Sequence, residues 1–201
     1  MKILAVQNRM GIGDMIIFLP YIEAISKKFK NPVSILVKEN TKSSEILKNN
    51  PYIDKIIFLD RNDRTKKGRH FGFSGTLNLA SDIQKYNFDK VFIFNSSLRF
   101  RLIMKIAKIK DIYQYKLFDK KKQNIIKAAQ DFLNKSINLD VESKPIISIS
   151  PKDINEAFLK YNIVKKNINI LLGVGGSGDT KRVAVEKYIE FIKLCTSNYE
   201  C

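Results

Sequence analysis

A glycine turn near the start of the chain carries residues that could do chemistry. It covers residues 10–14 and lies between an apolar run and an apolar helical pattern. Gly11 and Gly13 would let a ligand approach the backbone, and the first turn of the following helix would offer free N–H groups to an anion. Asp14 could accept a proton from a hydroxyl group, or it could be a simple helix N-cap. The spacing does not match G-x-G-x-x-G, so it does not predict a dinucleotide site.

A second glycine-rich turn follows an apolar run late in the chain and again precedes a helical pattern. Its candidate phosphate-binding residues are Gly175, Gly176, Ser177, Thr180 and Lys181. Backbone amides and one ammonium in this arrangement could hold a diphosphate. The pattern is not the Walker motif, because two residues separate Gly178 from Lys181. A flexible Gly/Ser linker is the alternative, and the ordered patterns on both sides weigh against it.

The remaining residue types that often form sites predict none here. His70 is the only histidine and has no cysteine or carboxylate cluster at ligand spacing, so we expect no metal site and interpret it as a solvated loop residue. The lysines at 120–122 are interpreted as a solvated helix start. Cys195 and Cys201 are the only cysteines, which does not suggest a disulfide framework.

Strand and helix patterns alternate along the chain. The predicted strands are residues 2–7, 33–37, 55–59, 90–95, 168–174 and, more weakly, 111–115. The predicted helices are residues 14–29, 43–48, 75–86, 98–109, 122–137, 154–161 and 183–195. Alternation at this spacing predicts an α/β fold with a parallel sheet covered by helices on both faces. We expect a Rossmann-like domain over residues 1–150, and over residues 151–201 a linker with the first strand, turn and helix of a second Rossmann-like domain.

The chain is strongly basic, with a net charge of +16. Such a charge attracts nucleic acid, nucleotide phosphates or an anionic membrane surface. Arginine, which nucleic-acid-binding proteins favour for planar contacts, is scarce, so nucleic-acid binding is the least favoured of the three. The first apolar run is too short for a signal peptide, and no stretch approaches the ~20 apolar residues of a membrane span. These features predict a soluble, cytoplasmic protein.

The opening segment, KILAVQNRMGIGDMIIFLPYIEAISKKF, resembles the start of the heptosyltransferases of glycosyltransferase family 9. Those begin with a strand, a turn ending in Gly-Asp and a helix with a Leu-Pro pair, here Leu19-Pro20. NPYIDKIIFLD and FDKVFIFNSSLRFRLI are similar to later strand segments of the family. GVGGSGDTKRVAVEKYIEFI resembles its glycine-rich stretch, with Val183-Ala184 where the family has Trp-Pro. The second domain of the family continues for well over a hundred residues beyond this point.

The resemblance implies a GT-B architecture and an inverting, metal-independent sugar transfer without a cofactor. It implies that Asp14 is the general base and that Lys181 steadies the leaving diphosphate. The donor would be a nucleotide sugar, typically ADP-heptose, and the acceptor the anionic inner core of lipopolysaccharide, with peripheral contact to the inner membrane. The residues expected to contact that acceptor are Arg61, Arg64, Lys66, Lys67 and Arg69.

Two other interpretations stay open: a non-catalytic nucleotide- or anion-binding remnant, and a basic nucleic-acid-binding protein. The second domain is represented only by its first elements, so we expect the 201-residue chain alone to be inactive.

Overall fold

The computed structural model describes residues 1–61, 68–117, 124–175 and 182–199. The chain divides into two compact units, Met1–Ser148 and Ile149–Cys201. Each unit is described by itself. No helix among the described residues is long and apolar enough to cross a membrane.

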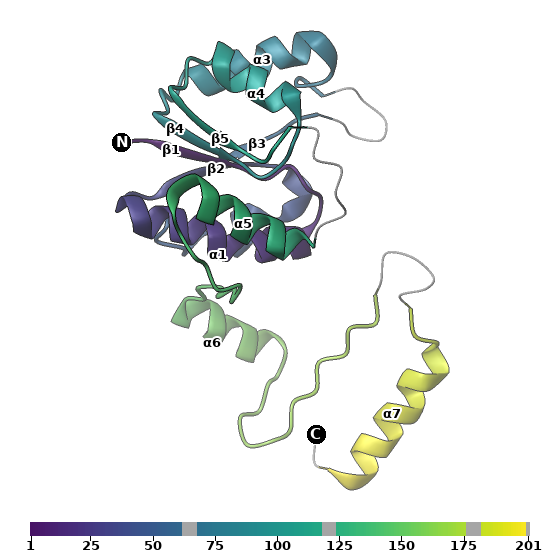
Figure 1. Ribbon diagram of the computed structural model, residues 1–201. Coiled ribbons are helices and arrows are strands. Elements are labelled where there is room, and N and C mark those ends of the chain that lie inside the picture. The colour runs from purple at the N-terminus through teal and green to yellow at the C-terminus, as the bar shows by residue number, and fades with distance from the viewer. Residues whose placement is uncertain (62–67, 118–123, 176–181, 200–201) are drawn as a thin grey trace. The chain divides into compact units, whose positions relative to one another are not determined.

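The first unit is a parallel sheet of five strands with helices on both faces (Figure 1). The strands are β1 (Ile3–Val6), β2 (Val33–Val37), β3 (Ile53–Phe58), β4 (Lys90–Ile93) and β5 (Asp111–Gln114). Their order is β3-β2-β1-β4-β5. On one face lie α1 (Ile12–Phe29) and α5 (Ile125–Ile137), and on the other α3 (Gly72–Gln84) and α4 (Leu98–Ile106). A short turn of 3-10 helix, η1 (Glu39–Thr41), and α2 (Ser43–Ile46) connect β2 to β3. The predicted α/β parallel-sheet fold is confirmed.

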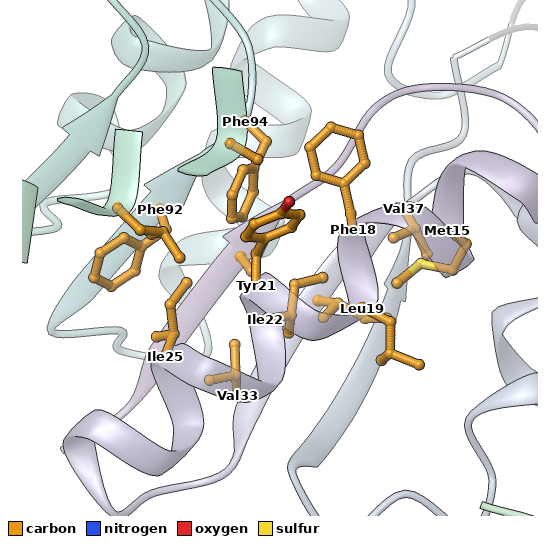
Figure 2. Close-up of a cluster of buried hydrophobic side chains, with 14 of the residues drawn as sticks. Met15, Phe18, Leu19, Tyr21, Ile22, Ile25, Val33, Val37, Phe92 and Phe94 are labelled. Carbon is orange, nitrogen blue, oxygen red and sulfur yellow. The ribbon is translucent and has the colours of Figure 1, made fainter. Parts of the chain in front are cut away.

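The central strands are buried on both faces, which explains their continuous apolar sequences. Side chains alternate across the sheet, so Ile3 and Ala5 join the core beneath α1 and α5, whereas Leu4 and Val6 join the core beneath α3 and α4. Figure 2 shows the first core, in which one side of α1 packs against β2 and β4. Its largest side chains are aromatic, and they meet edge-to-face at centroid distances of 5.3 Å for Phe18–Phe94 and 5.4 Å for Phe94–Phe132.

Helix α1 begins earlier than the pattern predicted, at Ile12 rather than Asp14. Pro20 lies in the interior of the helix and is buried there. Its ring has no N–H to donate to the carbonyl one turn earlier, and the burial of the surrounding apolar face keeps the helix continuous. α3 likewise begins at Gly72, three residues before the predicted start at Gly75. The lysine run at 120–122 lies outside the described residues.

The second unit contains α6 (Pro151–Lys160) and α7 (Val185–Asn198). The Ser150 hydroxyl caps α6 by accepting the N–H of Asp153 at 3.1 Å, and Pro151 occupies the first helical position. The predicted strand at 168–174 is wrong, because those residues form no strand and Leu171 is 97% exposed. A parallel strand needs neighbouring strands for its N–H and C=O groups, and no described segment of this unit provides one.

Candidate functional site

The strand order creates a crevice at one edge of the sheet. β1 pairs with β2 on one side and with β4 on the other, so connections leave the carboxyl ends of β1 and β4 in opposite directions. In open α/β sheets, ligands bind in the crevice outside the carboxyl ends of the strands at such a switch point. The segments that begin there are residues 7–11 after β1 and residues 94–97 after β4. The first glycine turn is therefore at the edge of the sheet where binding is expected.

The first glycine turn forms the N-terminus of α1. Gly11 is the N-cap, with φ 98° and ψ 162°, and no side chain caps the helix. Asp14 is the third residue of the helix, so the alternative interpretation of Asp14 as the N-cap is wrong. Its half-buried carboxylate makes no hydrogen bond or ion pair with the residues that the structure describes. The N–H groups of the first turn of α1 and the Asp14 carboxylate are therefore available to bind a ligand.

The two glycines of the turn should respond oppositely to substitution by alanine. A Cβ on Gly13 would meet no atom within 4 Å, whereas Gly11 has a positive φ that side chains rarely adopt. Gly13→Ala should leave stability unchanged or raise it by up to ~1 kcal/mol, and Gly11→Ala should lower it by ~1–2 kcal/mol. Urea unfolding of both variants measures the difference. Equal destabilisation by the two substitutions would contradict this geometry.

A cavity of about 840 Å³ opens at the same edge, beside the ends of β1, β4 and β5 and against α5. Phe18, Phe94 and Phe132 form its apolar wall. Its polar side chains come from the segments after β1, β4 and β5, from the last residue of β5 and from α5: Asn8, Arg9, Asn95, Ser96, Gln114, Lys116, Asp131, Lys135 and Ser136. Asp14 precedes Phe18 by four residues on α1, so the carboxylate lies one turn away on the same face of the helix.

Hydrogen bonds hold the polar residues of the cavity in place. The Asn95 amide donates to Asn8 Oδ1 at 3.1 Å. The Gln114 amide donates to the carbonyl oxygens of Asn95 and Ser97 at 3.1 and 2.9 Å. The Oε1 atom of Gln114 and the hydroxyl of Tyr115 are buried without a partner among the described residues. Both are therefore available to a bound polar group.

The charge of the cavity favours an anionic or polyhydroxyl ligand. Arg9, Lys116 and Lys135 line it, and its one described carboxylate, Asp131, is engaged by Lys127 at 2.9 Å. Burial raises the pKa of the Tyr115 phenol far above its ordinary value, so the hydroxyl stays protonated and can donate. Sequence reasoning missed these residues. The available signal was the pair of polar residues a short distance after two buried strands, Asn8 and Arg9 after β1 and Asn95 and Ser96 after β4.

The basic loop after β3 is only partly described. Arg61 is exposed, whereas Arg64, Lys66 and Lys67 lie outside the described residues. Arg69 forms a bidentate ion pair with Asp82 of α3. Its Nε donates to Oδ2 at 2.9 Å and one Nη atom donates to Oδ1 at 3.1 Å. Arg69 is thus committed within the protein, and an acceptor would have to compete with Asp82 for it.

His70 is not a solvated loop residue, because it is 5% exposed. Its Nδ1 accepts the backbone N–H of Asp60 at 3.1 Å, which leaves the proton on Nε2, and Nε2 donates to Asp82 Oδ2 at 3.2 Å. The sequence offered no sign of this burial, since both partners are at least ten residues away. His70 ties the end of the β3 segment to α3.

Asp82→Asn is expected to destabilise the fold in a pH-dependent way. The hydrogen bond from Arg69 is the main cause that holds the pKa of Asp82 well below its usual value. An unfolded Asp titrates near ~4, so the stabilisation is complete above that pH and is lost as the pH falls toward the lower folded pKa. Urea unfolding at pH 7 and pH 3 should show a smaller effect of Asp82→Asn at pH 3. Glu45→Gln, which removes the exposed Lys42–Glu45 pair, is the control and should change little at either pH.

The second glycine turn lies almost entirely outside the described residues. Gly175 is exposed. Gly176, Ser177, Thr180 and Lys181 fall in the segment that the structure does not describe, and they remain predictions. Within the described ranges, no cluster of three His, Cys, Asp or Glu side chains could hold a metal ion.

Comparison with known proteins identifies the fold. No family model and no curated protein match the sequence. Among solved structures, a glycosyl transferase family 9 protein from Veillonella parvula superposes with a TM-score of 0.74 at 20% identity, over 96% of this chain and 60% of that chain. This chain has the fold of a glycosyltransferase. ADP-heptose lipopolysaccharide heptosyltransferase II of E. coli matches with a TM-score of 0.57 at 13% identity, over 83% of this chain and 52% of that chain.

The glycosyltransferase fold extends beyond the sheet unit. Heptosyltransferase WaaC of E. coli, solved with ADP, matches with a TM-score of 0.57 at 15% identity, over 96% of this chain and 64% of that chain. The likeness supports the GT-B-like fold that the resemblance implies. The chain spans 52–64% of the length of these three glycosyltransferases.

Proposed function

We propose that this chain belongs to a glycosyltransferase that moves a heptose from ADP-heptose to the inner core of lipopolysaccharide, with residues 1–150 as its acceptor-side domain. The observation that carries the proposal is the Asp14 carboxylate, which has no partner among the described residues and stands beside the switch point of a glycosyltransferase fold. A base placed there is free to act on a substrate rather than to stabilise the fold.

The proposed reaction needs one base and one site of charge stabilisation. Asp14 takes the proton of an acceptor hydroxyl as its oxygen attacks the anomeric carbon of the donor. The bond from that carbon to the diphosphate oxygen breaks, and the electron pair leaves with ADP. Lys181, with the turn at Gly175, Gly176, Ser177 and Thr180, stabilises the negative charge that develops there. No metal or cofactor is needed for this sequence of steps.

The acceptor is proposed to occupy the cavity beside the carboxyl ends of β1, β4 and β5. Arg9, Lys116 and Lys135 complement the acidic groups of a lipopolysaccharide core, and Asn8, Asn95 and Gln114 can bind sugar hydroxyls. The loop cations at Arg61, Arg64, Lys66, Lys67 and Arg69 would extend this basic surface. The enzyme would act in the cytoplasm, in peripheral contact with the inner membrane.

The test is a transfer assay on the full-length protein with ADP-heptose and a lipopolysaccharide acceptor that lacks heptose. Release of ADP that depends on the acceptor, with a heptosylated product seen by mass spectrometry, is the expected result. The 201-residue chain is expected to show neither turnover nor tight ADP binding by calorimetry. ADP binding by the full-length protein without transfer would instead favour a non-catalytic anion-binding module.

A further inference from the structure

One face of the first unit exposes an apolar patch that the proposed reaction does not use. α3 and α4 pack side by side on the same face of the sheet (Figure 1). Arg99 of α4 donates to the Thr76 hydroxyl of α3 at 2.9 Å and to the carbonyl oxygen of His70, which fixes the two helices together. We call the exposed apolar side chains of these helices the α3/α4 patch: Phe73, Leu77, Leu98, Leu102 and Ile106.

Within each helix the patch residues lie on one face. Phe73 and Leu77 are four residues apart on α3, and Leu98, Leu102 and Ile106 repeat every four residues on α4. Residues at this spacing share one face of a helix. The inward residues of α4, Phe100, Ile103 and Met104, are buried against the sheet, so the patch residues point away from it. Their exposure ranges from 38% to 80%. Scattered exposed leucines need no explanation, but five large apolar side chains on two adjoining helices mark an interaction surface.

Cations lie beside the apolar residues of the patch on α4 and just after it. Residues 98–110 contain five Arg and Lys residues and no Asp or Glu. Arg99 is turned inward, whereas Arg101, Lys105, Lys108 and Lys110 form no ion pair with a described carboxylate. The one acidic residue of α3, Asp82, is neutralised by Arg69 and Lys85. The α4 side of the patch is therefore positively charged.

We propose that the α3/α4 patch docks the protein on an anionic lipid bilayer, with the leucines and Phe73 entering the interfacial region and Arg101 and Lys105 binding lipid phosphates. Amphipathic helical faces with a basic rim bind membranes in this way, because apolar burial adds to the attraction of anionic headgroups. The charge disfavours a second copy of this chain as the occupant. In a two-fold dimer the same patch would face itself, and the cations of both copies would meet. The inference rests on the proposed function in one respect, because it assigns a surface to the membrane contact proposed there, whereas vesicle binding can be measured without any sugar transfer.

The experiment is co-sedimentation of the 201-residue chain with vesicles of phosphatidylglycerol and phosphatidylethanolamine, compared with phosphatidylcholine vesicles. The chain should bind the anionic vesicles preferentially. The double substitution Leu98→Gln and Leu102→Gln should weaken this binding by about 10-fold or more. Arg101→Gln with Lys105→Gln should weaken it several-fold, most clearly at low salt.

Two matched controls separate the patch from the overall charge. Leu159→Gln with Leu171→Gln removes two exposed leucines from the second unit, and Lys28→Gln with Lys30→Gln removes two exposed cations from the end of α1. Both controls should bind as the unsubstituted chain does, and circular dichroism melts check that all variants remain folded. Equal binding by patch and control variants, or absence of binding to anionic vesicles, would overturn the proposal. So would loss of a dimer, seen by analytical ultracentrifugation, as the only effect of the leucine substitutions.

Discussion

Replacing Asp14 by Asn should lower the kcat of sugar transfer by about 10²–10⁴, the range expected for loss of a general base. The amide keeps nearly the same shape but cannot take the acceptor proton. The side chain has no partner among the described residues, so the fold should lose little stability. KM for both substrates should change much less than kcat, because the proton moves only in the transition state. The measurement is steady-state ADP release by the full-length protein.

A suitable control for Asp14→Asn is Glu39→Gln. Glu39 is an exposed carboxylate in the first turn of η1. Its replacement removes the same charge from the same unit and should leave kcat unchanged. Full turnover by a folded Asp14→Asn variant would mean that Asp14 only complements the helix dipole.

Phe92→Ala should reduce the free energy of unfolding of the first unit by about 3–5 kcal/mol. Phe92 is fully buried on β4, in the cluster shown in Figure 2. Its ring stacks on Tyr113 at a centroid distance of 4.7 Å and also meets Phe29 and Phe132. Alanine would leave a cavity between β4, β5 and α5 that these neighbours cannot fill without moving. Urea unfolding followed by circular dichroism measures the loss.

The matched control is Phe73→Ala on α3, whose side chain is 80% exposed. It removes the same atoms from a solvated position and should change the free energy of unfolding by less than ~0.5 kcal/mol. Similar effects of the two substitutions would contradict the packing around Phe92.

The sequence alone was sufficient to predict the elements of the first unit and its glycine turn. Strands buried on both faces must be almost wholly apolar. The apolar runs at β1, β2 and β4 therefore predicted these strands from the sequence. The turn at Gly11 was predictable because a positive φ before a helix calls for glycine. The role of Asp14 came from a family resemblance and stays a prediction.

Contacts between distant segments were decided only by the tertiary structure. Asn8 and Asn95 meet although they are 87 residues apart, because β1 and β4 become neighbours in the sheet. His70 is buried because Asp60 and Asp82 satisfy both ring nitrogens, and no local pattern encodes that arrangement. At residues 168–174 the sequence instead predicted an element that the tertiary structure does not form. Its local pattern was that of a strand, but a strand exists only where neighbours accept its hydrogen bonds, and the described residues of its unit supply none.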